Sequence, residues 1–228
     1  ESAYSGGLDF RHRWGEKQWN VSGRALFSNV NGTTAAITRT QRAFEHNFQR
    51  PDAEELSVDT TLTSLTGHAG NLSVAKYGGN RRFQTGSTWR SPEFEINDIG
   101  FLRSANEINY YLRTGYNINQ PFSIFRRYRV NFNHWSRWDF GGNHLYHALN
   151  TNMHAEFKNF WQAGAGVTRE FKDISNNFLR GGPALRLNAG FFWWGYVSTN
   201  NQKSVSFYTK WNVGYGDGQM KMNLHEIL

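Results

Sequence analysis

The 228-residue chain has no cysteine, only four prolines and no long apolar run. Without cysteine, a disulfide framework, thiol catalysis and cysteine-ligated zinc sites are excluded. A membrane-spanning helix needs about 20 consecutive apolar residues, and no segment approaches that length. No segment carries a convincing helix signal, and residues 1–7 contain neither a basic nor an apolar targeting segment. The sequence therefore excludes a helical membrane protein and indicates an all-β fold.

Large aromatic residues are abundant, with nine Trp, ten Tyr and 18 Phe. Mean hydropathy is only −0.68. These two facts are compatible in a transmembrane β-barrel, because only every second strand residue faces lipid and aromatic residues gather at both membrane interfaces. Twenty-three glycines against four prolines also favour a barrel, where proline would interrupt the hydrogen-bond ladder.

Apolar and polar residues alternate along most of the chain, which is the pattern of a half-buried strand. In residues 107–118, one face carries Ile108, Tyr110 and Leu112, and the other carries Glu107, Asn109 and Arg113. The alternation predicts about eleven strands, at residues 4–14, 17–30, 55–66, 68–77, 81–91, 107–118, 122–138, 143–157, 159–170, 184–197 and 204–216. Several of these exceed the ~9–11 residues that a tilted membrane strand needs.

The predicted connections are of two kinds, as in outer-membrane barrels. Short turns are expected at 15–17, 78–80, 119–121 and 199–203, and long polar loops at 31–55, 91–106 and 172–182. We predict one domain, residues 1–228, forming an antiparallel transmembrane β-barrel. Because the strand count is odd and the tail does not end in an aromatic residue, we expect the barrel to continue beyond Leu228.

Arginines recur on the strand faces opposite the apolar sets. The candidate basic residues of the barrel lumen are Arg11, Arg13, Arg24, Arg82, Arg90, Arg113, Arg127, Arg129 and Arg186. Acidic residues expected on matching faces are fewer, namely Asp9, Asp59, Glu107 and Glu156. Two interpretations remain open: Arg–carboxylate ladders that fill the interior, favoured because buried arginines are retained where they pair bidentately, or a surface that attracts anions or acidic protein segments.

Tryptophans at the ends of alternating strands are candidates for the interface girdles. These residues are Trp14, Trp19, Trp135, Trp138, Trp193, Trp194 and Trp211. Stacking on sugars is the alternative interpretation of the runs at 135–138 and 191–194. Interface girdles are the favoured one.

Catalytic and metal sites are not indicated. His144 and His154 share a predicted face but lie ~33 Å apart at ~3.3 Å per residue, and His147 points the other way. Glu93 and Glu95 resemble a paired-carboxylate motif, but a solvated loop is the favoured interpretation. The net charge of +7 is spread along strands rather than clustered, which argues against nucleic-acid binding. We expect no enzyme activity, cofactor, metal or nucleic-acid partner.

Several segments resemble a family of large, poorly characterised outer-membrane barrel proteins of Bacteroidota. The segment 95–103 matches the family motif E-x-N-D-x-G-F-L. Further matches are at 125–127, 133–140, 157–161 and 180–186, so that the resemblance spans about residues 58–218. Those proteins carry an N-terminal module similar to family 9 carbohydrate-binding modules, which this chain lacks, and the family offers no catalytic residues to carry over. The resemblance implies architecture and location more than activity.

The leading hypothesis is a barrel in the cell outer membrane of a Gram-negative bacterium, acting as a scaffold or as a subunit of an envelope assembly. Its partners would be outer-membrane lipid, lipopolysaccharide and other envelope proteins. A second hypothesis is a channel or uptake component for acidic glycans or other anions. A third is a soluble carbohydrate-binding β-domain.

Overall fold

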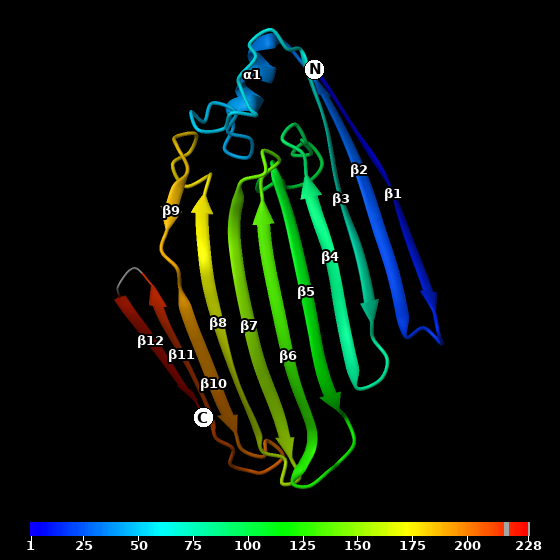
Figure 1. Ribbon diagram of the computed structural model, residues 1–228, viewed down its shortest axis with the longest axis vertical. Coiled ribbons are helices and arrows are strands. Elements are labelled where there is room, and N and C mark those ends of the chain that lie inside the picture. The colour runs from blue at the N-terminus through cyan, green and yellow to red at the C-terminus, as the bar shows by residue number, and fades with distance from the viewer. Residues whose placement is uncertain (217–218, 228) are drawn as a thin grey trace.

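The computed structural model describes residues 1–216 and 219–227 and shows one antiparallel sheet with a single short helix (Figure 1). The expectation of an all-β antiparallel fold is confirmed. The helix is α1 (Thr34–Arg42). The strands are β1 (Ser2–Trp14), β2 (Trp19–Asn31), β3 (Ser64–Lys76), β4 (Arg81–Arg90), β5 (Glu107–Ile118), β6 (Phe125–Trp138), β7 (His144–Phe157), β8 (Gln162–Ser175), β9 (Leu185–Leu187), β10 (Phe191–Ser198), β11 (Tyr208–Gly216) and β12 (Gln219–Ile227).

Each strand pairs with the next along the chain, except that β9 is a short side branch on β8 and β10 continues the sheet. The sheet is open, because β1 and β12 lie at opposite ends of the order and do not pair with each other. The predicted barrel is therefore not closed by this chain. Whether strands continue beyond Leu228 lies outside the described residues.

Four segments differ from the predicted strand pattern. The predicted strands 55–66 and 68–77 are one strand, β3, preceded by a loop, and the predicted strand 184–197 is divided into β9 and β10. β12 was not predicted. α1 contradicts the expectation of no helix, although its signal was present: the Thr33 hydroxyl caps the first turn by accepting the Ala36 N–H at 3.2 Å.

Gln41 joins α1 to the loop that returns to β3. Its side-chain amide donates to the carbonyl of Asp59 at 2.8 Å and accepts the Asp59 N–H at 2.7 Å, as a neighbouring strand would. Ile37, one turn earlier, is buried beside Phe48 and Leu65. In the described part of the chain, no helix is long and apolar enough to cross a membrane.

The strand registers place the apolar sets of neighbouring strands on the same side of the sheet, here called the apolar face. Its members include Leu8, Phe10 and Trp14 on β1, Phe27 on β2, Leu72 on β3, Trp89 on β4, Leu112 on β5, Phe132 on β6, Met153 on β7, Val167 on β8, Trp193 on β10 and Val213 on β11. The opposite side, the polar face, carries arginines, asparagines and serines. Facial segregation thus continues from β1 to β11.

Burial on the two faces is the reverse of that in a water-soluble domain. On the apolar face, Leu8 is 80% exposed and Leu72 is 50% exposed. On the polar face, Ser73 is 5% exposed and Asn150 is 8% exposed. Polar side chains such as those of Ser73 and Asn150 are enclosed, while large apolar side chains such as those of Leu8 and Leu72 have little protein cover.

Several aromatic rings lie over a glycine of the adjacent strand. Phe10 lies over Gly23, Trp89 over Gly70, Trp211 over Gly195, Trp194 over Gly166 and Tyr196 over Gly164. A Cβ added at Gly166 would lie 2.6 Å from Nε1 of Trp194, and one added at Gly70 would lie 2.5 Å from the Trp89 ring. Alanine at these positions would displace the rings, which explains part of the glycine content.

Long loops gather at one end of the sheet and short turns at the other (Figure 1). The loop end carries residues 32–63 with α1, residues 91–106 and residues 176–184, which together we call the cap. Its segments interlock: the Ala105 N–H donates to Glu45 O at 2.8 Å, Asn177 Nδ2 donates to Ser104 Oγ at 3.0 Å, and the Ala184 N–H donates to Asp52 at 2.7 Å.

The cap packs on the polar face, over a small apolar area of β2 and β3. Phe94, Leu102 and Ala105 of the cap form one cluster with Ala69 and Leu26 of the strands. Gly67 lies directly under the cap backbone, because a Cβ there would overlap the N and Cα atoms of Phe94. The cap therefore covers the loop end of the polar face over β2 and β3.

We expect Gly67→Ala to lower the free energy of unfolding by about 1–3 kcal/mol, because the added methyl group displaces the backbone at Phe94. Gly6→Ala, in β1, is the matched control, since a Cβ there meets no atom within 4 Å, and we expect a change within about 0.5 kcal/mol. Urea unfolding followed by tryptophan fluorescence measures both. Equal losses in the two variants would show that the cap does not rest on Gly67.

Candidate functional site

Eight of the nine predicted lumenal arginines share the polar face. Arg186 does not: it pairs with Ile174, while the adjacent pair Asp173–Leu187 continues the polar-face row from Tyr146. Arg186 therefore lies on the opposite side of the sheet and is exposed.

Two carboxylates form the cross-strand ladders that the sequence suggested. Glu107 pairs with Arg90 and, at 3.1 Å, with Arg137. Glu156 pairs with Arg126 and Arg127. The side chains are described for residues 1–216 except residue 172. Among them, no carboxylate lies within ion-pair distance of the other polar-face candidates. These candidates are Arg11, Arg13, Arg24, Arg82, Arg113 and Arg129. Asp59 belongs to the cap, where it accepts hydrogen bonds from Thr61.

The seven girdle candidates divide between the faces. Five lie on the apolar face, namely Trp14, Trp19, Trp138, Trp193 and Trp211. Trp135 and Trp194 lie on the polar face, since Trp135 pairs with Tyr111 and Trp194 with Gly166. Trp14 and Trp19 stack at the turn end with ring centroids 5.9 Å apart. Trp193, by contrast, pairs with Val167 in the middle of β8.

The predicted facing of His144 is wrong. A β-bulge pairs Trp138 with His144 and leaves Leu145 as the extra residue, so His144 joins His147 instead of His154. The rings of His144 and His147 lie 5.9 Å apart, and Ser136 Oγ is 2.8 Å from Nε2 of His144. Among the described residues, no three His, Asp or Glu side chains are arranged to hold a metal ion.

Glu93 and Glu95 lie in the cap loop after β4, as expected, but the prediction of solvated charges is wrong for Glu95, which is buried. The N–H of Glu95 donates to Ser28 Oγ at 3.0 Å, which fixes this loop to β2. Glu95 accepts from His46 at 2.9 Å and from the Asn97 N–H at 2.5 Å, and Nδ1 of His46 donates to Pro92 O at 2.7 Å. This segment is the family-like motif, and its acidic residue has a structural role here.

Burial alone would raise the pKa of Glu95. The hydrogen bonds from His46 and from the Asn97 N–H, together with the charge on His46, outweigh burial and hold the pKa below its ordinary value. The ionised Glu95 therefore stabilises the cap.

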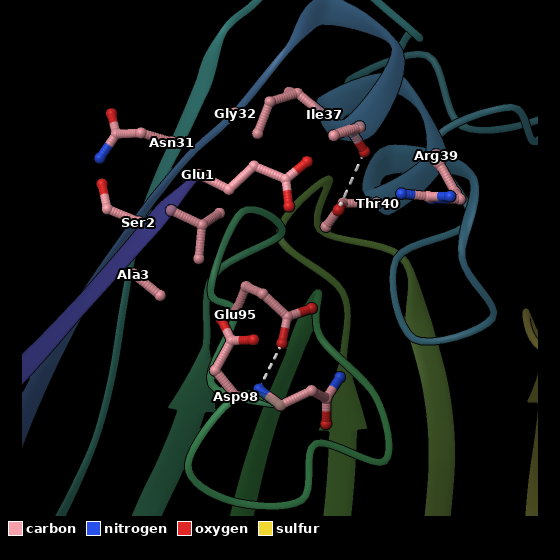
Figure 2. Close-up of a pocket in the computed structure, with 13 residues that line it drawn as sticks. Glu1, Ser2, Ala3, Asn31, Gly32, Ile37, Arg39, Thr40, Glu95 and Asp98 are labelled. Atoms are coloured by element: carbon pink, nitrogen blue, oxygen red, sulfur yellow. Dashed lines mark hydrogen bonds between the residues drawn. The ribbon is translucent and has the colours of Figure 1, made fainter.

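A cavity of about 540 Å³ lies between α1, the start of β1 and the motif loop (Figure 2). Its carboxylates are Glu1, Glu95 and Asp98, and its one cation is Arg39. Figure 2 shows α1 on one side and Glu95 and Asp98 on the other. Glu95 already accepts the hydrogen bond from the Asn97 N–H. Because Glu95 is committed to the cap, the cavity offers no assembled reactive group.

The turn end of the polar face is open and basic. A groove of about 340 Å³ is lined by Arg82, Asn117, Arg127, Arg129, His154, Glu156, Gln162 and Tyr196, among others. A second hollow of about 220 Å³ shares Arg82, Asn117 and Arg129 with it and adds Arg113. We call the two together the basic groove. Its one carboxylate, Glu156, is already paired with Arg126 and Arg127, so the groove has an excess of positive charge.

An asparagine network begins in the groove, where Asn131 and Asn133 line the second hollow. Asn131 donates to Asn152 at 2.7 Å, and Asn133 and Asn152 both donate to Asn150, at 2.8 and 2.7 Å. Asn150 donates in turn to Thr168 at 2.8 Å. Neither these asparagines nor Tyr196 was predicted as a site residue from the sequence. The signal was present, since asparagines two apart recur in two consecutive strands.

Comparison with protein families matches residues 7–225 to a domain of unknown function, DUF5916. No curated protein and no solved structure matches the chain. The comparisons therefore assign no activity, substrate or partner to the basic groove.

We expect the cap to lose stability as the pH falls below about 4.5, because Glu95 has a lower pKa in the folded state than in the unfolded chain. The contribution is present above the unfolded pKa and is lost as the pH falls through the folded pKa. In Glu95→Gln this acid-dependent loss should be smaller, and the stability at pH 7 should fall by about 1–3 kcal/mol.

Glu93→Gln is the matched control, since Glu93 lies in the same loop and forms no hydrogen bond or ion pair in the described structure. Urea unfolding of all three proteins between pH 3 and 7 makes the comparison. An unchanged acid dependence in Glu95→Gln would contradict the assigned role of Glu95.

Proposed function

The chain belongs to the family of DUF5916 domains, and we propose that it forms part of the wall of an outer-membrane β-barrel. In this proposal it serves as a scaffold or as a subunit of an envelope assembly and has no catalytic role. Its partners are outer-membrane lipid, lipopolysaccharide and other envelope proteins.

The reversed burial of the two faces is the observation that carries the proposal. Large apolar side chains such as Leu8, Phe27 and Leu72 are at least half exposed, whereas Ser28, Ser73 and Asn150 on the other face are buried. Exposed apolar patches of this extent are normally covered by lipid or by another protein surface. Lipid is the cover that matches a continuous apolar face on long, consecutive strands.

Strand length supports the same occupant. β6, β7 and β8 each have 14 residues. At about 3.3 Å per residue and a tilt of about 45°, such a strand crosses about 33 Å, close to the ~30 Å hydrocarbon core of a bilayer. A strand in a soluble domain averages only about 5–6 residues.

The distribution of connections and polar groups also supports the proposal of an outer-membrane barrel. Short turns at one end and long loops at the other are characteristic of outer-membrane barrels. Polar side chains on the polar face bond to one another, as in the half-buried Asn131–Asn152 pair at 2.7 Å, which suits a face turned to the interior of a barrel rather than to lipid. Closure into a barrel requires strands that pair with the free edges of β1 and β12.

Two alternative functions predict different experimental results. A second sheet or a second copy of the chain would give a water-soluble sandwich, the setting for the alternative carbohydrate-binding domain. A channel would share the membrane location but would conduct ions. Conductance with anion preference in a planar bilayer would favour the channel, and a stably inserted but silent barrel would favour the scaffold.

We expect Leu72→Arg to destabilise the protein in lipid vesicles by about 2–4 kcal/mol, because the added charge faces the hydrocarbon near the middle of β3. Thr88→Arg is the matched control: it lies at the height of Leu72, since Thr88 pairs with Asn71, but on the polar face. The expected change there is within about 0.5 kcal/mol. Guanidinium unfolding in vesicles, followed by the heat-modifiability of the band on a gel, provides the measurement.

Membrane fractionation of the native protein is the direct companion test. Partition with the outer membrane and a gel shift on boiling would support the proposal. A protein that stays soluble without detergent, with Leu72→Arg as stable as Thr88→Arg, would overturn it, and sedimentation would then show whether a second copy covers the apolar face.

A further inference from the structure

We propose that the basic groove binds an acidic saccharide, with Arg82 and Arg129 holding its acidic groups and the ring of Tyr196 supporting a sugar ring. The inference rests on the side chains of the groove and does not depend on a membrane location. It also names a site that none of the comparisons assigns.

Three guanidinium groups in the groove, those of Arg82, Arg113 and Arg129, have no acidic partner among the described side chains. Arg129 lines both hollows, and in the described residues it forms no ion pair. Arg82 also lines both, and its Nε donates to Gly79 O at 3.2 Å, which leaves its terminal nitrogens for a ligand. A planar guanidinium group recognises a carboxylate or sulfate through two parallel hydrogen bonds, so paired cations favour a ligand with acidic groups on adjacent units.

Tyr196, which lines the groove, is the central member of an aromatic row. The rings of Trp194 and Tyr196 lie 6.2 Å apart and within 8° of parallel, and Tyr208 continues the row 6.2 Å from Tyr196. Gly166 and Gly164 of β8 have no side chains under the first two rings. A ring face of this kind packs against the C–H face of a sugar, which a small inorganic anion cannot exploit.

The position of the Tyr196 ring is fixed from its hydroxyl end as well. Nδ1 of His154 lies 3.2 Å from the Tyr196 hydroxyl, and Arg129 pairs with His154 across β6 and β7. Arg129 of β6, His154 of β7 and Tyr196 of β10 therefore lie in one row across the sheet, with Gly164 of β8 between the last two. Asn117 and Gln162, which also line the groove, offer amide groups that can bond to sugar hydroxyls.

The occupant that these features favour is larger than one anion and more polar than an aromatic acid. Two cations, an aromatic platform and amide groups match a short chain of uronic acids or sulfated sugars. Unlike the cavity beside α1, the groove contains no acidic side chain that is not already paired. An acidic ligand would therefore enter without like-charge repulsion.

The test is calorimetric titration of the folded full chain with digalacturonate, a disaccharide with one carboxylate on each ring. Neutral galactobiose and inorganic sulfate are the comparison probes. We expect digalacturonate to bind at least about tenfold more tightly than galactobiose, and more weakly as salt is raised. Arg129→Gln and Arg82→Gln should each weaken binding by about tenfold or more. Tyr196→Leu should weaken binding of digalacturonate but leave the response to sulfate unchanged.

Two arginine variants are matched controls. Arg24→Gln removes a charge from the polar face outside the groove, and Arg186→Gln removes one from the opposite face. Both should leave the affinity within about twofold.

Three results would overturn the proposal: no binding of digalacturonate up to about 10 mM, equal weakening in Arg24→Gln and Arg129→Gln, or no effect of Tyr196→Leu. The last would indicate non-selective anion binding. Circular dichroism of each variant verifies folding, and the titration with and without detergent separates failure of this site from failure of the membrane proposal.

Discussion

Cross-strand register is the constraint on which the rest of the structure depends. A strand residue can face one of only two sides, so a difference of a single residue in pairing would exchange the apolar and polar faces. The pairings from β1 to β11 keep Leu8, Leu72 and Met153 on one side and Asn20, Ser73 and Asn150 on the other. The bulges in β6–β8 interrupt this alternation locally and bring His144 onto the face of His147. The register also decides which side chains lie side by side on each face, and so it determines which residues form the basic groove.

The two ends of the polar face are specialised in different ways. At the loop end, the cap places Phe94 and Leu102 over apolar positions of β2 and β3, and the buried pair of His46 and Glu95 fixes the loop that carries them. At the turn end, no loop covers the arginines, and Glu156 neutralises charge only on Arg126 and Arg127. One face of one sheet therefore contains a small hydrophobic core and an open cationic surface.

Alternation was sufficient to predict the fold class, most strands and the face of eight of the nine arginines. It failed where another interaction decided the outcome. α1 was missed because its stability comes from the Thr33 cap and the contacts of Gln41 with Asp59, which strand periodicity does not detect. His144 was assigned to the wrong face of the sheet because a bulge changes the pairing of β6 with β7. Arg186 was assigned to the polar face wrongly because it lies in the three-residue strand β9, where it pairs with Ile174. The groove could not be predicted, since it joins residues of β4, β5, β6, β7, β8 and β10 whose proximity follows from pairing alone.

The rings seated on glycines have a consequence for assembly of the sheet. A strand that slips by two residues keeps every apolar side chain on its proper side, so hydrophobicity cannot distinguish the slipped pairing from the native one. The slip would, however, move Phe10 from Gly23 to a neighbour that carries a side chain, and would do the same to Trp89 and Trp211. Of Trp194 and Tyr196, one would move to Thr168 or Gln162 and the other would still meet a glycine. Gly23, Gly70 and Gly195 thus each accommodate an aromatic ring only in the native alignment. These glycines therefore favour the native strand register over one shifted by two residues.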